Sequence, residues 1–326
     1  MNAPSVSVIT PVGQAFERVK QVLFRPFDLG RWFVIGFGAW LAHLGQGGGG
    51  YNFRFPTGQT GNVDFQTAVE RARDYVAANL YWIVPVAVIV FVCAFCIGVL
   101  LLWLSSRGTF MFLHCVALNR AEVVVPWNRF QRAGNSLFWF RLLLGLANFV
   151  IMVPLLVLAG LRAYRMLMAD SWPAAGILTL VGFGLALVVV AIAFGVVHAL
   201  LHDFVVPIMF LRGKPCLAGW RELQPLLAAR VGSFVLYFLF QIVLGIAIGV
   251  LVVAAVLVTC CIAGCLLMLP YIGTVALLPV LVFQRAYSLF YFAQFGPEFD
   301  VFRAPAPPLV PPPAAPPPPP DLAAGV

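Results

Sequence analysis

Two histidines and an aspartate, His198, His202 and Asp203, form the grouping best suited to chemistry in this 326-residue sequence. Histidines four residues apart lie on one face of a helix, a geometry that proteins use to bind a divalent metal. His114 and its neighbour Cys115 follow an earlier apolar run and would add ligands from a second helix. The candidate metal ligands are therefore His114, His198, His202 and Asp203.

A structural interpretation of these residues competes with the metal site. Membrane desaturases and hydroxylases that use this spacing need more histidines than the four in this chain. An intramembrane zinc protease needs a glutamate after the first histidine, where Ala199 stands. The alternative is a polar helix end at the membrane interface, with Asp203 paired with a nearby arginine. Nucleophile motifs, phosphate-binding loops and paired carboxylates are absent from the sequence, so we predict no cofactor and no catalytic residue.

The composition identifies the class of protein. Hydrophobic residues make up 62% of the chain and charged residues only 10%, and the mean hydropathy is +0.97. A soluble globular chain typically carries about 25% charged residues, which cover its apolar interior. The sequence therefore predicts an integral membrane protein.

Apolar runs of roughly 20 residues predict an all-α, polytopic bundle of about six transmembrane helices. The first run is the shortest, and prolines interrupt the last. The predicted spans are Arg31–Gln46, Leu80–Ser106, Leu137–Leu161, Ala174–Leu201, Val231–Leu257 and one that begins between Ile262 and Ile272.

The basic residues indicate topology rather than nucleic-acid binding. The net charge is +8, but most of the 20 lysines and arginines flank the apolar runs on one side of the predicted membrane. Cytoplasmic loops carry such an excess. We therefore expect both termini in the cytoplasm and no nucleic-acid partner.

The domain organisation follows from these runs. Residues 1–30 form a cytoplasmic N-terminus with an amphipathic helix, and residues 31–295 form the membrane domain. An external loop with an interfacial helix occupies about 47–79. Residues 296–326 form a proline-rich tail, which is expected to be a disordered or polyproline spacer or a ligand for an aromatic-lined groove.

A weak internal repeat is visible on the cytoplasmic side. Basic amphipathic segments start near a proline at Pro11–Val19, Pro126–Phe130 and Pro215–Leu223, and each leads into an odd-numbered span. Proline at the first helical position is a helix start signal. The pattern predicts three units, each an interfacial helix plus a helical hairpin. The alternative is that amphipathic helices resemble one another by chance.

The predicted spans lack ionisable residues at their centres, which argues against a proton-coupled or ion-coupled carrier. Asn148 and Gln241 are the conspicuous amides near the middle of the spans. We expect them to form hydrogen bonds between helices. Gly245 and Gly249 form a GxxxG pattern that is expected to permit close helix contact.

Several segments of the chain carry a recognisable family pattern: Val22–Phe33, Ser106–Leu113, Asn119–Ala121 with Pro126–Trp127, Gly134–Phe138, Asp203–Met209, and Leu269–Gly273 through Gln294–Glu298. They resemble an uncharacterised family of bacterial six-span membrane proteins. The resemblance covers most of Thr10–Phe302, and His114 stands where the family pattern has an acidic residue. The chain is also distantly similar to the membrane domain of glycerophosphodiester phosphodiesterases, whose soluble catalytic barrel this chain lacks.

The leading functional hypothesis is a non-enzymatic protein of the bacterial inner membrane. It would act in membrane or envelope organisation, lipid homeostasis or complex assembly. Its expected partners are the bilayer, anionic lipid headgroups and a membrane protein. The second hypothesis is a permease or lipid-handling transporter with a polar groove lined by Asn148, Gln241, His198 and His202. The third is a metal-dependent membrane enzyme.

Overall fold

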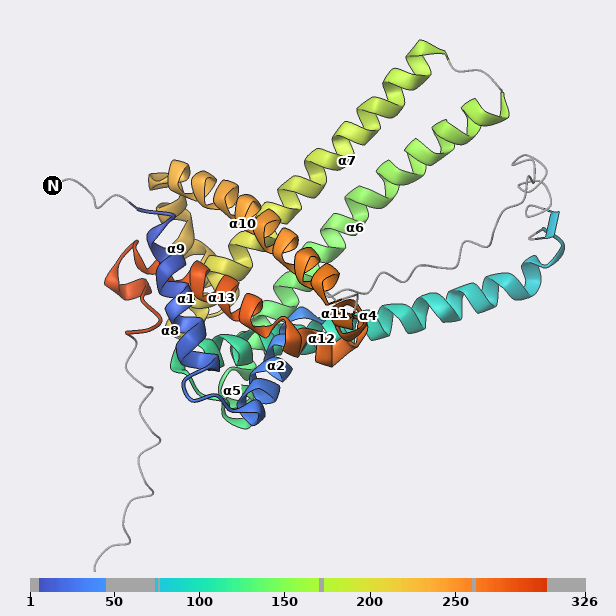
Figure 1. The fold of residues 1–326 in the computed structure, drawn as a ribbon. Coiled ribbons are helices and arrows are strands. Elements are labelled where there is room, and N and C mark those ends of the chain that lie inside the picture. The colour runs from blue at the N-terminus through green and yellow to red at the C-terminus, as the bar shows by residue number, and fades with distance from the viewer. Residues whose placement is uncertain (1–5, 45–73, 76, 170–172, 260–261, 304–326) are drawn as a thin grey trace, which may run out of the picture.

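The computed structural model describes residues 6–44, 74–75, 77–169, 173–259 and 262–303, and this part of the chain is helical and contains no β-strand. The predicted all-α class is confirmed (Figure 1). The helices are α1 (Thr10–Leu23), α2 (Leu29–His43), α4 (Leu80–Leu118), α5 (Val124–Arg129), α6 (Gln131–Met168), α7 (Ala174–Leu200), α8 (Val206–Arg212), α9 (Cys216–Ala229), α10 (Val231–Val258), α11 (Ile262–Met268), α12 (Pro270–Ala276) and α13 (Leu278–Ala293). The π-helical turn η1 (Leu201–Val205) joins α7 to α8, and the 3-10 turn η2 (Pro297–Phe299) follows α13.

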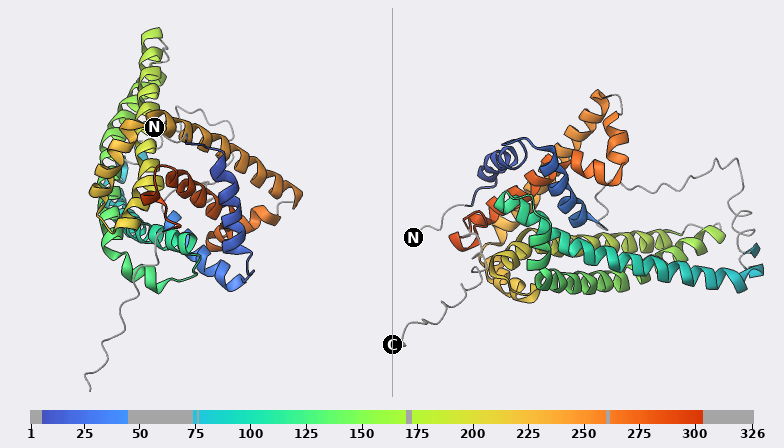
Figure 2. Two further views of the ribbon diagram at one scale, coloured as in Figure 1. Left: turned by 90° about the vertical axis from the view of Figure 1, so that its left-hand side faces the viewer. Right: turned by 90° about the horizontal axis from the view of Figure 1, so that it is seen from below.

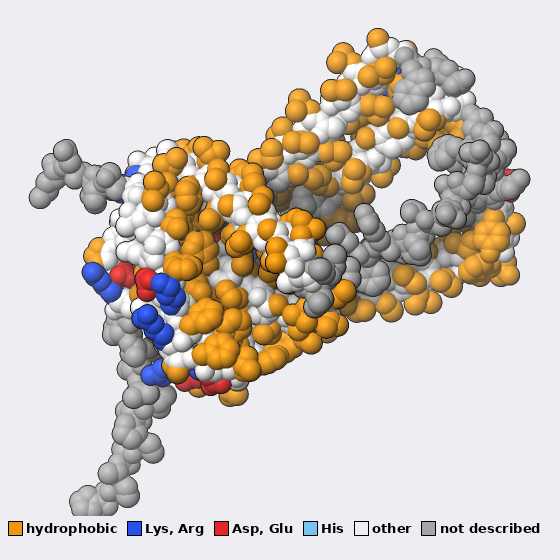
Figure 3. All heavy atoms as spheres, in the orientation of Figure 1, with side chains coloured by type: hydrophobic (Ala, Val, Ile, Leu, Met, Phe, Trp, Pro, Cys, Tyr) orange, Lys and Arg blue, Asp and Glu red, His pale blue; other side chains and the backbone are white. Residues whose placement is uncertain are grey.

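Four helical stretches are long and apolar enough to cross a membrane: α4, α6, α7 continued through η1 and α8, and α10. Helices α6 and α7 run side by side, α4 contacts α6 and diverges from it further out (Figure 1), and the outer parts of all three extend well beyond the rest of the molecule (Figure 2). These three outer parts are called the arms. Their surfaces are covered with apolar side chains (Figure 3). Such surfaces are stable in lipid and not in water, so the structure is compatible with a membrane protein.

The core lies at one end of the molecule, here called the compact region. It contains α1, α2, α5, α8, α9, α13 and the last third of α4, whose residues from Ser105 onward are mostly buried. Both ends of the described chain meet there. The backbone N–H of Ser7 donates to Gln294 Oε1 at 2.8 Å, and Tyr287 Oη donates to the carbonyl of Val8 at 3.1 Å.

Arginines from the N-terminal segment bind the end of α4. The guanidinium of Arg18 donates to the carbonyls of Val116 and Ala117 at 2.6–3.0 Å. Arg31 donates to the carbonyl of Asn119, which closes α4 in the left-handed conformation with φ 55°. The last carbonyls of a helix have no intrahelical partner, so these cations stabilise its end. Burial lowers the pKa of Arg18 from its usual value.

Helix α2 packs tightly against α4 through small residues. A Cβ added to Gly108 would lie 2.5 Å from Leu41 Cβ and 2.6 Å from the backbone nitrogen of Ala42. The hydroxyl of Ser105 donates to the carbonyl of Ala42 at 2.7 Å. The absence of a side chain at Gly108 therefore permits the backbones to approach each other.

The first and last predicted spans differ from the other four. Helix α2 has 15 residues and lies in the compact region, with Ile35 and Ala39 fully buried. The last run is divided into α11, α12 and α13 because Pro270 and the segment around Leu277 end the helices. A continuous crossing needs about 20 helical residues. Six spans therefore remain a prediction.

Two features differ from the sequence-based expectations. The fourth predicted span ends at Leu201, but the helical chain continues from α7 through η1 into α8. The π turn ends at Val205, so Pro207 falls in the first turn of α8, where a missing N–H is tolerated. Gly245 and Gly249 have no neighbouring atom within 4 Å of an added Cβ, so they form no close contact in this chain.

The three amphipathic segments all form helices, α1, α5 and α9, each followed by the predicted next helix. Their descent from a repeated unit stays a prediction. The glycine run and interfacial helix within 47–79 fall mostly outside the described residues, and the proline-rich tail beyond Arg303 falls entirely outside them.

The contact between α2 and α4 gives a stability prediction. In Gly108→Ala the new methyl group must push the two backbones apart, and we expect the free energy of unfolding to fall by about 1–3 kcal/mol. The measurement is the unfolding midpoint of the detergent-solubilised protein.

The matched control is Gly98→Ala in the same helix, where an added Cβ meets no atom within 4 Å. This variant should unfold at the wild-type midpoint or slightly above it, because alanine is the better helix former. Equal midpoints for the two variants would contradict the tight contact at Gly108.

Candidate functional site

A buried polar network occupies the junction between the arms and the compact region. Asp203 lies in η1 and accepts two hydrogen bonds: Tyr237 Oη is 3.0 Å from its Oδ2, and His202 Nδ1 is 3.0 Å from its Oδ1. The side-chain amide of Gln241 donates to Tyr237 Oη at 2.7 Å. The sequence-predicted residues His202, Asp203 and Gln241 are therefore connected through Tyr237, and these four residues are called the Asp203 network.

Arg285 of α13 supplies the positive charge of this network. Its Nη1 donates to the carbonyl of His202 at 2.7 Å and lies 4.0 Å from Asp203 Oδ1. The side chain is only 2% exposed. The expected pairing of Asp203 with a nearby arginine is confirmed, and the arginine is 82 residues away in the sequence. A buried pair of this kind avoids the large cost of leaving either charge alone.

The π-helical turn explains the position of Asp203. In η1 the backbone N–H of Val206 bonds to the carbonyl of Leu201, one residue further back than in an α-helix. The extra residue rotates the following side chains relative to those of α7. Phe204, which lies on the same π turn as Asp203, is fully buried against Phe234, Tyr237 and Phe292. Such π turns occur often at functional sites.

Two cavities flank this junction, and they divide the predicted polar groove. His202 and Gln241 line one cavity of about 270 Å³ together with Asp203 and Arg285. Asn148 and His198 line another of about 610 Å³, which lies between α4, α6 and α7. The structure therefore places Asn148 and His198 at one cavity and Gln241 and His202 at the other, and a single groove that all four residues line stays a prediction.

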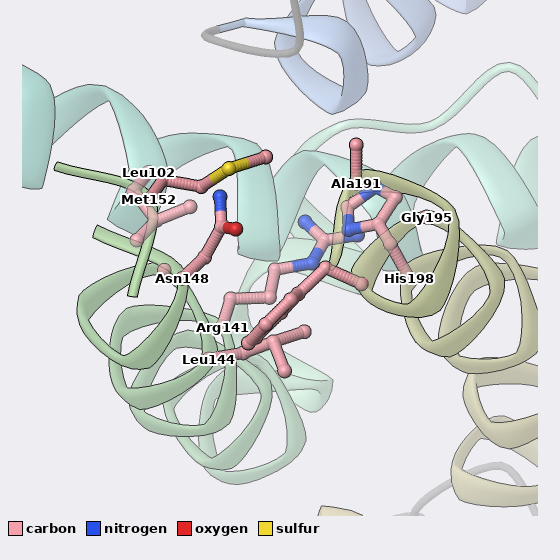
Figure 4. Close-up of a pocket in the computed structure, with 10 residues that line it drawn as sticks. Leu102, Arg141, Leu144, Asn148, Met152, Ala191, Gly195 and His198 are labelled. Carbon is pink, nitrogen blue, oxygen red and sulfur yellow. The ribbon is translucent and has the colours of Figure 1, made fainter. Parts of the chain in front are cut away.

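The larger cavity contains a buried arginine, which the sequence indicates only as one of the basic residues that flank the apolar runs. Arg141 of α6 lies between Asn148 and His198 in the close-up of this cavity (Figure 4). The Arg141 residue is 4% exposed, and its only hydrogen bond among the described residues is a long one of 3.5 Å from Nη1 to Thr109 Oγ1. Its Nε and Nη2 have no partner. This is a buried cation that lacks a paired anion within the described part of the chain.

The nearby thiol does not neutralise Arg141. Cys216 is the group whose ionised form would favour the charged guanidinium. Burial raises the pKa of the Cys216 thiol to about 12, even though Arg141 lowers it. The thiol is therefore neutral at physiological pH, and the charge of Arg141 stays uncompensated by this residue.

The two amides predicted to join helices do so only indirectly or not at all. Gln241 bonds within its own helix, to Tyr237, and reaches η1 only through that hydroxyl. The oxygen of Asn148 is buried and has no hydrogen-bond partner. A polar atom in this state inside an apolar region is available to a ligand or water.

The candidate metal ligands are not brought together. His114 packs against Phe130 and Phe210, and its nearest acid is Glu122 at 3.7 Å. His198 faces the larger cavity, whereas His202 and Asp203 line the smaller one. Within the described ranges no three histidine, cysteine or acidic side chains form a group that could hold a metal.

Comparison with known families places the chain. A model described as a family of unknown function, DUF7544, matches residues 6–276. The chain belongs to this family. No curated protein and no solved structure matches it. The comparisons give no link to glycerophosphodiester phosphodiesterases, so that distant similarity remains a prediction.

Sequence reasoning on this DUF7544 member missed Arg141, Arg285 and Tyr237. Both arginines border apolar runs, which is also where topology-determining charges lie. Tyr237 is one of several aromatics in a long apolar helix. One signal for this pairing was present in the sequence, the single acid Asp203 beside an apolar run, because an acid in that position needs a cationic partner. It did not indicate which basic residue that partner is.

The Asp203 network gives a second prediction. Asp203→Asn removes the negative charge and leaves Arg285 buried without its partner. We expect the free energy of unfolding in detergent to fall by about 3–5 kcal/mol. The denaturant midpoint of the purified protein measures this loss.

Two controls make this test specific. Glu17→Gln removes an acid that pairs with Lys20 on the exposed face of α1, and its midpoint should not change measurably. The double variant Asp203→Asn/Arg285→Met removes both buried charges and should recover much of the lost stability. A double variant as unstable as the sum of its single changes would refute the charge pairing.

Proposed function

We propose that this DUF7544 chain is a multi-pass protein of the bacterial inner membrane that acts without catalysis in lipid homeostasis and membrane organisation. The observation that carries the proposal is the division of the molecule into apolar arms and a compact region that holds the charges. The arms expose apolar residues along their length, while charged side chains gather at the compact end (Figure 3). That arrangement suits a protein whose arms contact lipid and whose compact region lies at one membrane face.

The charges of the compact region favour its placement on the cytoplasmic side. Arg18, Arg129, Arg212 and Arg230 lie on or beside its short helices α1, α5, α8 and α9. Cytoplasmic segments are rich in such residues, and anionic lipid attracts them. Because both described chain ends meet in this region, they lie on one side of the membrane.

The proposal includes six membrane segments. Helices α4, α6, α7 and α10 would cross fully, and α2 and the broken α11–α13 stretch would enter as short or interrupted segments. Non-helical backbone at membrane depth is stable where protein covers it. The hydrogen bond from Tyr271 Oη to the carbonyl of Phe33, at 2.6 Å, connects these two stretches.

A lipid-handling transporter is the second candidate, favoured by the cavity of about 610 Å³ beside the arms. It differs from the first candidate in requiring that lipid move. Reconstituted vesicles with a fluorescent phospholipid in one leaflet would separate the two. Accelerated transbilayer exchange favours transport, and an unchanged rate favours an organising role.

The topology gives the third prediction. Alkaline phosphatase is active only outside the cytoplasm, so a fusion after Ala169, at the outer end of α6, should be active in a bacterial host. Fusions after Lys214 and after Arg303, both in or next to the compact region, should be inactive. A fluorescent protein at the same sites should report the opposite pattern.

The control is membrane extraction of the unfused chain, which should stay in the membrane pellet at alkaline pH. Activity after Lys214 would reverse the proposed orientation. Release of the chain into the alkaline supernatant would refute the integral membrane location itself.

A further inference from the structure

We infer that the cavity around Arg141 is a binding site for the anionic headgroup of a membrane phospholipid, with the phosphate on Arg141 and the acyl chains in the clefts beside α6. This inference rests on the proposed membrane location. No cofactor or metal is involved, and binding makes and breaks no covalent bond. The charge of the site, its depth and its shape all fit such a headgroup.

The charge of the site calls for an anion. Two buried guanidinium groups, Arg141 and Arg285, act on each other across this junction, and of the arginines in the described part of the chain Asp203 pairs with Arg285 and not with Arg141. Arg141 keeps two N–H-bearing nitrogens, Nε and Nη2, without acceptors. Arginine binds phosphate oxygens with parallel N–H donors. A phosphate at this place would therefore pair a charge that is otherwise costly to bury.

The depth of the site matches that of a lipid headgroup. The 20 residues Leu142–Leu161 of α6 carry no charge, and at about 1.5 Å each they extend about 30 Å, the thickness of the hydrocarbon core. Arg141 borders this stretch on the compact side, and Arg162 borders it on the other. His198 of α7 lines the same cavity as Arg141. Arg107 of α4 contacts Asn135, six residues nearer the start of α6, so it lies closer to the compact end.

The shape of the site accommodates acyl chains. Arg141 borders two clefts, one of about 610 Å³ towards α7 and another of about 580 Å³ between α4 and α6. Leu102 and Gly145 line both clefts. The second cleft is lined otherwise by apolar residues such as Phe91, Phe95 and Phe149. A soluble phosphate would leave these apolar clefts empty, whereas the acyl chains of a diacyl lipid would fill them.

The side-chain oxygen of Asn148 narrows the chemistry expected of the headgroup. This buried acceptor has no donor in the structure and lies beside Arg141 in the same cavity (Figure 4). A headgroup that carries both a phosphate and hydroxyl groups supplies an acceptor for Arg141 and a donor for Asn148. Phosphatidylglycerol has this chemistry and is the probe for the experiment.

The experiment measures lipid binding to the purified full-length chain by native mass spectrometry, with dioleoylphosphatidylglycerol added back after delipidation. Wild-type protein should retain one tightly bound lipid. Arg141→Gln should weaken this binding by about tenfold or more, because a charge-assisted contact is lost. Arg107→Gln is the matched control. It removes the same charge from an arginine that lines neither cleft and already contacts Asn135, Trp103 and Trp127, and should bind as wild type does.

A second pair of variants tests the site without changing any charge. Gly145→Leu places a side chain where an added Cβ meets no atom within 4 Å, so the chain can fold while both clefts become smaller. It should lose the lipid. Gly160→Leu on the same helix also points into open space but lies away from both clefts, and should retain it.

Each outcome decides the inference. It is overturned if Arg141→Gln, or Gly145→Leu where the arginine variant does not fold, retains the lipid as the controls do. It is also overturned if dioleoylglycerol, which lacks the phosphate, binds equally well. Displacement of the lipid by millimolar glycerol 3-phosphate would assign the site to a soluble phosphate instead. All these results are compatible with an integral membrane protein, so only alkaline extraction and the fusions bear on the proposed function.

Discussion

The structure depends on an unequal set of buried charges. Arg141 and Arg285 bring two positive charges to the junction of the arms and the compact region, and Asp203 brings one negative charge. The π turn η1 and the hydroxyl of Tyr237 hold the carboxylate in place. In an apolar environment each ion requires a partner, so α7, α10 and α13 are fixed relative to one another by this network. Arg141 remains outside it, and the requirement for its counter-ion connects the fold to a function.

The arms and the compact region meet at Arg141, so the counter-ion that this arginine requires must bind at their junction. Helix α6 contacts α4 and α7, and clefts lie between these helices. In water such clefts would be unstable because they expose apolar walls. In a bilayer lipid tails fill them without cost. The molecule therefore brings lipid into contact with a buried cation, which an evenly packed bundle would prevent.

Sequence reasoning predicted the elements that depend on composition and periodicity. Four long helices and the amphipathic helices α1, α5 and α9 follow from runs and spacing that are visible in the chain. It could not predict that α2 and α13 belong to the core, because a buried core helix and a membrane span are equally apolar. It also missed the continuation of α7 through η1 into α8, since a π turn has no sequence signature other than tolerance of Pro207. The pairing of Asp203 with Arg285 needs tertiary structure, and so does the difference between Arg141 and a surface arginine such as Arg107.

A protein partner could also supply an acid to Arg141, and the geometry argues against it. A carboxylate from another chain would have to reach a residue that is 4% exposed, between three helices of this chain. Entry from the compact side is blocked by the packed start of α6, where Ala133 and Leu137 are buried. The clefts open instead along the arms, where the molecules at hand are lipids. In the proposed membrane location, the anion with the shortest path to Arg141 is therefore a phosphate that is already attached to acyl chains.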